Sequence, residues 1–150
     1  MTLPDDFSQF VESFLAREVR FLVVGGHAVS VHARPRFTDD FGLWVGTDPD
    51  NAARVAAAIA DFGFGSLGLS AADFSAPDVI VQLGRPPHRI DIRTTLAGVE
   101  FEACWERRAS ATFGRLTTPL IGLDCLRANK RAVGRNKDLA DLDLLDGLGD

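Results

Sequence analysis

Two aspartates stand where their side chains could take part in chemistry. Asp40 opens the apolar stretch DFGLWVG, and Asp91 lies between two isoleucines in HRIDIRTT. Carboxylate oxygens are the ligands that hard divalent cations take in proteins, so the first stretch raises the question of a metal site. For Asp91 an ordinary explanation stands beside a functional one, because a strand that alternates Ile, Asp, Ile can turn its carboxylate to water. The sequence leaves both explanations open.

A pair of adjacent glycines, Gly25 and Gly26, separates the apolar stretch FLVV from HAVSVHA. A strand that runs through glycines into a helix presents bare backbone N–H groups at the positive end of that helix, which is a favourable place for an anion. A plain tight turn explains the same pair, so the glycines alone do not distinguish the two. The acidic residue that follows on the next strand, Asp40, strengthens the anion-binding interpretation.

The elements that must position these residues alternate between helices and strands. Helices are predicted over 4–17, from apolar residues at helical spacing, and over 49–61, an alanine-rich stretch after a capping Asp48. The segment 62–76, with several Gly, Ser and Phe residues, is expected to be irregular. Strands are predicted over 19–26, 39–46, 78–84 and 88–95, a hairpin over 109–122 with Gly114 at its turn, short helices over 27–33 and near 101–108, and two helices broken near Gly134 over 122–147.

The whole chain, 1–150, is long enough for one domain with a substantial core. The element order predicts an α/β fold in the broad sense (α+β): a small mixed β-sheet with helices packed on it, including the C-terminal helices of 122–147.

Composition narrows the classes of function. With 46% hydrophobic residues and no long apolar run, the chain does not resemble a membrane protein, and its N-terminus lacks the pattern of an export signal, so we expect a cytoplasmic location without a membrane partner. The net charge of −5 argues against broad nonspecific binding to nucleic acids. Cys104 and Cys125 are far apart in the sequence and are expected to be free, buried thiols.

A basic segment near the C-terminus, RANKRAVGRNKDLADL, contrasts with the acidic chain around it. Its cations either form ion pairs on a solvated helix face or bind phosphates. The charged residues in and next to this segment are Arg127, Lys130, Arg131, Arg135 and Lys137 against Asp124, Asp138 and Asp141.

Together, the glycine pair, RPRFTDD before a strand, RIDI and NKRAVGRNKDLADL resemble the nucleotidyltransferase superfamily with a polymerase-beta-like core, specifically its small bacterial minimal and toxin-like members. The resemblance covers about 21–142. In that family a strand, a Gly-Gly or Gly-Ser pair and a short helix precede an Asp-x-Asp strand, and a neighbouring strand supplies a third carboxylate. Asp40 matches the first carboxylate and Asp91 the third, but Gly42 stands in the second position.

The resemblance implies a metal-dependent transfer of a nucleotide from an NTP to a hydroxyl of RNA or protein. It implies Asp40 and Asp91 as catalytic residues and ligands of Mg²⁺ or Mn²⁺, and it also implies toxin–antitoxin systems and a cognate antitoxin partner. The residues that it implies for nucleotide binding are Gly25, Gly26, Arg36, Thr38, Lys130 and Lys137.

Glycine at position 42 leaves two hypotheses open. Either the transfer proceeds with reduced activity or with a substitute ligand, or the protein is an inactive member that binds nucleotide, nucleic acid or a protein. Asp39 could substitute only through a β-bulge, because it points away from Asp40 in a regular strand. His27 and His32 are further candidate ligands with ordinary packing as the alternative, and Trp44 and Trp105 are expected in the core.

Overall fold

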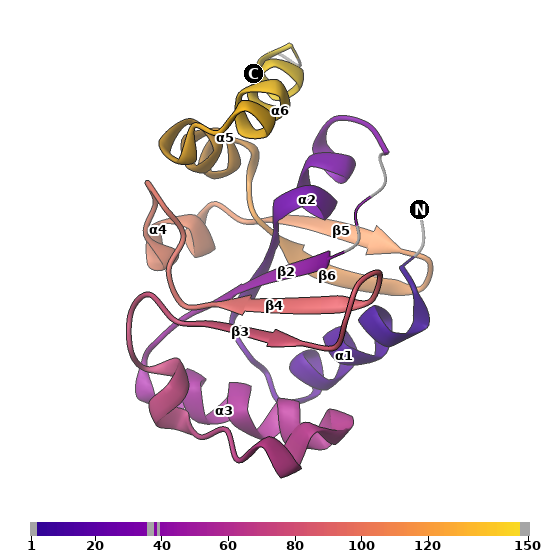
Figure 1. Ribbon diagram of the computed structural model, residues 1–150, viewed down its shortest axis with the longest axis vertical. Helices are drawn as coiled ribbons and strands as arrows, with labels where there is room; N and C mark the ends of the chain where they lie inside the picture. The colour runs from indigo at the N-terminus through magenta and orange to yellow at the C-terminus, as the bar shows by residue number, and fades with distance from the viewer. Residues whose placement is uncertain (1–2, 36–37, 39, 148–150) are drawn as a thin grey trace.

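The computed structural model describes residues 3–35, 38 and 40–147. It contains a six-stranded sheet in the order β3-β4-β2-β1-β6-β5, shown in Figure 1. The pairs β1–β2, β3–β4 and β5–β6 are antiparallel, whereas β2–β4 and β1–β6 are parallel, so the predicted mixed sheet is confirmed. The strands are β1 (Phe21–Val24), β2 (Asp40–Val45), β3 (Ile80–Leu83), β4 (Arg89–Arg93), β5 (Ala109–Phe113) and β6 (Leu116–Leu120).

Six α-helices complete the mixed α/β fold in the described part of the chain, and each lies within or close to a segment predicted to be helical. The predicted irregular segment instead contains short π and 3-10 turns at Ala60–Phe64, Gly65–Leu67 and Ala71–Phe74. None of the helices in the described ranges combines the length and the apolar character needed to cross a membrane. The helices are α1 (Asp5–Ala16), α2 (Gly25–His32), α3 (Pro49–Ile59), α4 (Phe101–Glu106), α5 (Leu123–Val133) and α6 (Asn136–Asp146).

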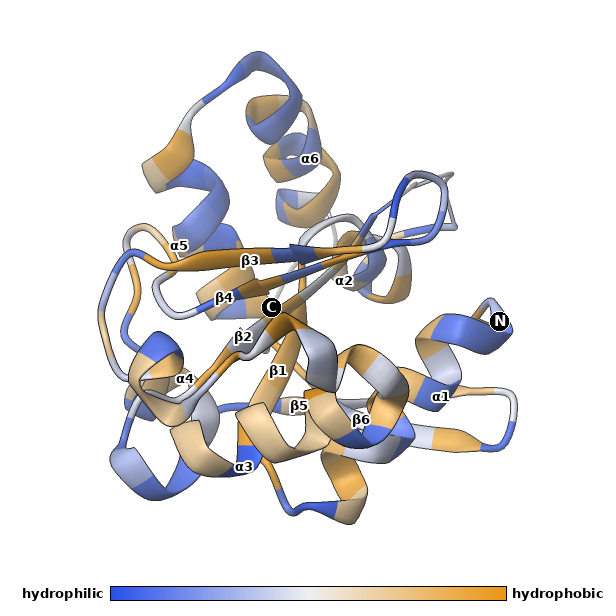
Figure 2. Ribbon diagram, turned by 60° about the horizontal axis from the view of Figure 1, so that its bottom comes forward, coloured by the Kyte–Doolittle hydropathy of each residue, from blue (hydrophilic) through white to orange (hydrophobic). Residues whose placement is uncertain are grey.

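One face of the sheet forms the main core with α1 and α3. Residues alternate along β2, so Phe41 and Leu43 point to this face while Asp40 and Gly42 point to the other. Phe7 of α1 stacks on Phe41 with ring centroids 4.9 Å apart, and both rings are fully buried. Figures 1 and 2 show α1 and α3 on this side of the strands.

The opposite side of the sheet carries α2, α5 and α6 (Figure 1). The last two helices are held together by buried charges: Lys130 Nζ of α5 lies 3.4 Å from Asp138 Oδ1 and 3.1 Å from Asp141 Oδ2, both of α6. Gly134, with φ of +68°, ends α5 in the left-handed conformation that glycine adopts without strain and lets the chain reverse. Both helices contact α2, and through it they are anchored to the sheet.

The expectation of two free thiols is wrong. Cys104 of α4 and Cys125 of α5 form a disulfide, and their Cα atoms lie 6.1 Å apart. The burial expected from the sequence is confirmed for both residues. Their pairing was not predictable from spacing, because it depends on how the end of β6 directs α5 back onto α4.

Under non-reducing conditions, Cys104→Ala should lower the free energy of unfolding by about 3 kcal/mol, because the crosslink restricts the unfolded chain. The two cysteines are 21 residues apart in the sequence. Urea unfolding followed by circular dichroism measures the change, and reduced wild-type protein, as the control, should lose a similar amount. Equal stability of the oxidised and reduced wild type would contradict a disulfide in the folded protein.

Candidate functional site

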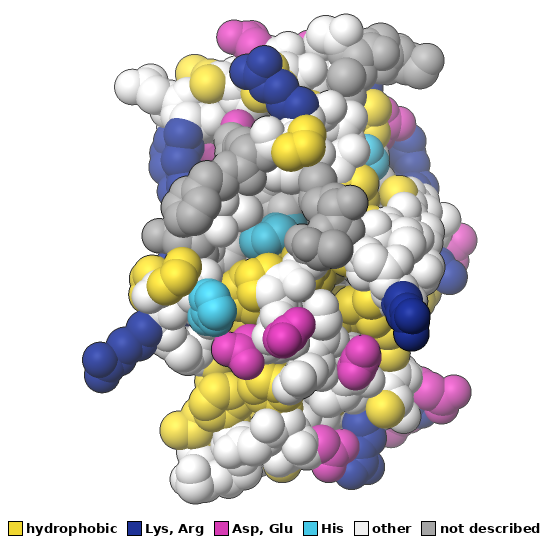
Figure 3. Space-filling model, turned by 90° about the vertical axis from the view of Figure 1, so that its right-hand side faces the viewer, with side chains coloured by type: hydrophobic (Ala, Val, Ile, Leu, Met, Phe, Trp, Pro, Cys, Tyr) yellow, Lys and Arg dark blue, Asp and Glu magenta, His cyan; other side chains and the backbone are white. Residues whose placement is uncertain are grey.

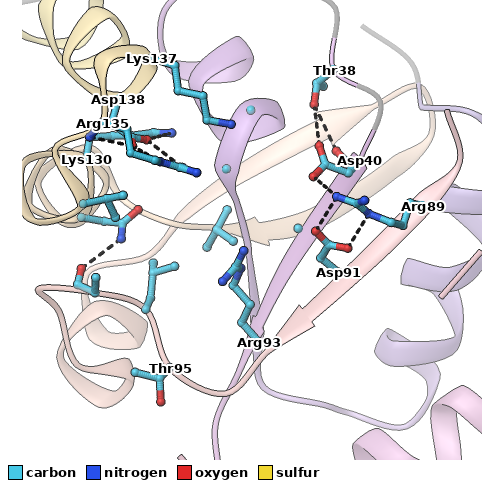
Figure 4. Close-up of a pocket in the computed structure, with 18 of the residues that line it drawn as sticks. Thr38, Asp40, Arg89, Asp91, Arg93, Thr95, Lys130, Arg135, Lys137 and Asp138 are labelled. Carbon is cyan, nitrogen blue, oxygen red and sulfur yellow. Dashed lines mark hydrogen bonds and ion pairs between the residues drawn. The ribbon is translucent and has the colours of Figure 1, made fainter. Parts of the chain in front are cut away.

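The register of two neighbouring strands brings the predicted aspartates together. In the parallel pair β2–β4, Asp40 lies opposite Arg89 and Gly42 lies opposite Asp91. Side chains of directly paired residues point to the same face of a sheet, so Asp40, Arg89 and Asp91 share the face opposite the main core. They line a cleft of about 570 Å³ between the sheet and the α2, α5 and α6 helices (Figure 4).

Arg89 connects the two carboxylates directly. Its Nε donates to Asp91 Oδ1 at 3.0 Å, and its Nη2 donates to Asp40 Oδ2 at 3.1 Å and to Asp91 Oδ2 at 3.4 Å. The planar guanidinium supplies several donors in a fixed fork, which fits two adjacent carboxylates better than a single-point ammonium would. The two acids and the arginine therefore form one hydrogen-bonded ion cluster (Figure 4).

Burial gives this cluster its electrostatic importance. Asp91 is only 4% exposed, and burial raises the pKa of its carboxyl above the ordinary value of 3.8, whereas the charge and hydrogen bonds of Arg89 lower that pKa. The negative charge of Asp40 adds a smaller upward contribution. Removing Arg89 would leave a buried carboxylate next to a second one without its compensating charge.

Gly42 leaves the space beside Asp91 without a side chain. Its backbone does not adopt a positive φ, so strand geometry does not require glycine here. A Cβ built at this position would lie 3.2 Å from Val24 Cγ2, a contact that a small shift of one methyl group relieves. A Cβ therefore fits if the Val24 side chain moves by a few tenths of an ångström, and the backbone conformation at this position is not one that only glycine adopts.

The glycine pair forms the first turn of α2, at the edge of the same cleft. The helix begins at Gly25, two residues earlier than predicted, and both Gly25 and Gly26 line the cavity. Gly25 has φ of +71°, a conformation that glycine adopts without strain and that explains why this residue type stands here. No side chain of a described residue caps this end of α2, which leaves room for an anion at its first N–H groups.

The cleft is more basic than the rest of the protein. Among the described lining residues, five basic side chains face three carboxylates, although the chain has a net charge of −5. On the face seen in Figure 3, by contrast, acidic and basic side chains are interspersed. The charged lining residues are Arg89, Arg93, Lys130, Arg135 and Lys137 against Asp40, Asp91 and Asp138.

The five cations of the cleft differ in whether they form ion pairs with described carboxylates. Arg93 of β4 and Lys137 of α6 extend into the cavity from opposite sides, and neither forms an ion pair with a described residue (Figure 4). Lys130, which the sequence predicted to contact phosphate, is buried between α5 and α6. It forms ion pairs there with Asp138 and Asp141. Arg135 Nε donates to Asp138 Oδ2 at 2.6 Å. Arg93 and Lys137 are the cations that remain available to a ligand.

The other predicted site residues, Thr38, His27 and His32, differ in whether they line the cleft. Thr38 Oγ1 donates to the Asp40 carbonyl at 3.2 Å and lines the cleft, which positions it to orient Asp40. His27 packs against Phe7 and Phe41, and burial lowers its pKa. His32 Nε2 lies 2.8 Å from the carbonyl oxygen of Ile121. Both histidines thus have packed positions, and neither lines the cleft.

Of the remaining candidates, Trp44 is buried as predicted, whereas Trp105 is half-buried with Arg108 over its ring at 4.1 Å. Arg36 and Asp39 lie outside the described residues.

Sequence reasoning missed Arg89, Arg93 and Gln82, all of which line the cleft. The signal for the arginines was present, since residues 89, 91 and 93 of one strand must share a face once Asp91 faces the site. Gln82 could be found only from the antiparallel register that places it opposite Asp91.

Comparison with protein-family models found no match for the chain, and comparison with curated proteins found none either. Which metal ion could bind at the site therefore has to be inferred from the ligating side chains that the site contains. Within the described ranges, no three His, Cys, Asp or Glu side chains gather as a metal site. Asp40 and Asp91 fit one Mg²⁺ ion, which proteins commonly hold by one or two carboxylates together with substrate phosphates. They do not supply the three carboxylates that the family resemblance implies for two ions.

We expect the pKa of Asp91 to respond in opposite directions to the loss of Arg89 and to the loss of Asp40. Arg89→Gln should raise it further above 3.8, and Asp40→Asn should lower it, as measured by carboxyl ¹³C NMR titration. Because the raised pKa means that the folded state holds this proton more tightly than the unfolded chain, stability should fall as the pH rises from 3.8 through the folded value. A lower pKa in Arg89→Gln would show that the guanidinium does not neutralise Asp91.

Proposed function

We propose that this protein is an NTP-dependent nucleotidyltransferase of reduced activity, which transfers a nucleotide to a hydroxyl of RNA or protein. The observation that carries the proposal is the convergence of Asp40 and Asp91 on one nitrogen of Arg89, in a basic cleft where a helix begins with two glycines. Carboxylates, cations and a helix N-terminus at one site are the groups that phosphoryl-transfer chemistry needs.

The position of each residue indicates which part of the proposed reaction it would serve. The start of α2 and the side chains of Arg93 and Lys137 surround the cavity and would bind and orient the negatively charged phosphate chain. Thr38 holds the Asp40 carboxylate, to which its Oγ1 donates at 3.4 Å. A magnesium or manganese ion held by Asp40 and Asp91 would supply charge neutralisation on the phosphates.

Gly42 explains why the activity should be low. Even groups that only support a metal ligand typically carry about 10- to 100-fold in metal affinity or activity, so a missing ligand should cost at least as much. The backbone of Gly42 does not require glycine, and a Cβ there requires a small shift of the Val24 side chain, so a substitution can test whether an added carboxylate restores the ligand.

A second candidate is nucleotide binding without transfer. Two observations favour it: Gly42 provides no ligand, and Arg89 already forms ion pairs with both remaining carboxylates. In this case the basic cleft would bind a phosphorylated ligand with no need for a divalent ion.

The cellular setting belongs to the same proposal. We infer a cytoplasmic protein whose partners are an NTP, an RNA or protein acceptor and, for a toxin-type member, a cognate antitoxin. Since cytoplasmic reductants keep most thiols reduced, Cys104 and Cys125 would then be a dithiol in the cell and form their disulfide under oxidising conditions.

The test uses each of the four α-labelled NTPs with Mg²⁺ or Mn²⁺ and total RNA, and measures label transfer and pyrophosphate release. Wild-type protein should transfer slowly, Asp91→Asn should abolish transfer, and Gly42→Asp should raise it by about 10-fold or more. Asp50→Asn is the matched control, because Asp50 is exposed at the start of α3, among the residues that do not line the cleft.

The two candidates give different results. Nucleotide binding that is independent of metal, with no pyrophosphate released even by Gly42→Asp, would leave only the binding module. If calorimetry detects no nucleotide binding, and Arg93→Gln and Lys137→Gln change nothing, both candidates are wrong.

A further inference from the structure

We propose that Arg89 is a built-in counter-ion that competes with a divalent cation for Asp40 and Asp91. A divalent cation at these oxygens would repel the guanidinium that is bonded to them and would take lone pairs that now accept its hydrogen bonds, so Arg89 opposes the binding of an ion there. This inference concerns how the proposed site is regulated, and it rests on the carboxylate pair in the structure.

The contacts of Arg89 show how completely it engages the pair. It donates to three of the four carboxylate oxygens of Asp40 and Asp91, at 3.0 to 3.4 Å. Asp91 is almost fully buried, and its described polar contacts come from Arg89. A buried carboxylate is strongly destabilised without a charged partner, so the chain supplies that partner from two residues earlier on the same strand.

The position of Arg89 also allows it to move. Its side chain is 30% exposed at the edge of the cleft, and the structure shows no contact of its guanidinium with any described acidic residue other than Asp40 and Asp91. Rotating the side chain into solvent would therefore break only the contacts that an incoming ion replaces. The competition is a direct one, for the same oxygen atoms.

Gly42 makes this arrangement stable. In the described part of the chain, the face around Arg89 holds two carboxylates that both form ion pairs with one guanidinium, and Gly42 adds no third carboxylate opposite Asp91. Two like charges 4 Å apart repel by about 4 kcal/mol at an effective dielectric constant of 20, and a third carboxylate would add further repulsion that the single arginine could not offset. The sequence thus combines a missing ligand with an internal cation.

A neighbouring arginine provides a matched control. Arg93 lies four residues further along β4 than Arg89, on the same face and in the same cleft, but it forms no ion pair with a described residue. Replacing either arginine by glutamine removes one positive charge from the site. Only the Arg89 replacement also frees the carboxylate oxygens.

The experiment measures Mn²⁺ binding to the nucleotide-free protein by electron paramagnetic resonance. Arg89→Gln should bind Mn²⁺ about 10-fold or more tightly than wild type, within the range typical of coupling between two ligands. Arg93→Gln should change the affinity by no more than about threefold, the screened effect of one charge. Adding Asp40→Asn to Arg89→Gln should remove the gain.

Folding is checked in the same samples by circular dichroism. If Arg89→Gln does not fold, Arg89→Lys keeps the charge but loses the fork of donors, and it should bind Mn²⁺ more tightly than wild type by a smaller factor. Equal gains in Arg89→Gln and Arg93→Gln, or no gain in the folded Arg89 variants, would overturn the inference. Because no nucleotide is present, a gain in Mn²⁺ affinity supports the inference even if no nucleotide transfer is ever detected.

Discussion

The ion cluster of Asp40, Arg89 and Asp91 is the interaction on which the site depends. Two carboxylates on adjacent strands repel each other, and one of them is almost completely removed from water. Such a pair persists only with a cation among its oxygens, and the chain provides one by alternating Arg and Asp along β4. The parallel register of β2 and β4 then determines which residues meet there.

The surrounding architecture turns this cluster into one wall of a cleft. The sheet gives its apolar face to α1 and α3, and this leaves its polar face free to form a site beneath α2, α5 and α6. The opposite wall depends on a second group of buried charges, in which Lys130 connects α5 to Asp138 and Asp141. Arg93 and Lys137 extend from the two walls without an ion pair to any residue that the structure describes, and their positive charges face the cleft where a phosphorylated ligand would bind.

Local patterns were sufficient to predict the elements, because each depends on residues close together in the sequence. The alternating strand RIDIR and the break at Gly134 are examples. Features that depend on tertiary geometry could not be found this way. The ion pairs of Lys130 are an example, because a pattern of charges does not show which carboxylates a neighbouring helix will bring to it. The disulfide was missed for a similar reason, since the distance between α4 and α5 is set by packing.

The candidate site lies between these two cases. The pattern of residue types indicated Asp40, Asp91 and the glycine pair, and the structure places all of them at one cleft. Arg89 is the first residue of RIDI, but its role depends on the carboxylate that the neighbouring strand β2 brings beside Asp91, which the sequence pattern does not show. Gly42 keeps its significance: its backbone does not require glycine, and the nearest obstacle to a Cβ is one methyl group of Val24.

The most direct measurement is a crystal structure with a non-hydrolysable NTP analogue and Mn²⁺, with the ion located by its anomalous scattering. Our account expects Mn²⁺ bonded to both Asp40 and Asp91, the phosphates near Gly25, Arg93 and Lys137, and Arg89 withdrawn from the carboxylates. Nucleotide or ion bound elsewhere, or Mn²⁺ on both carboxylates with Arg89 still bonded to them as before, would contradict it.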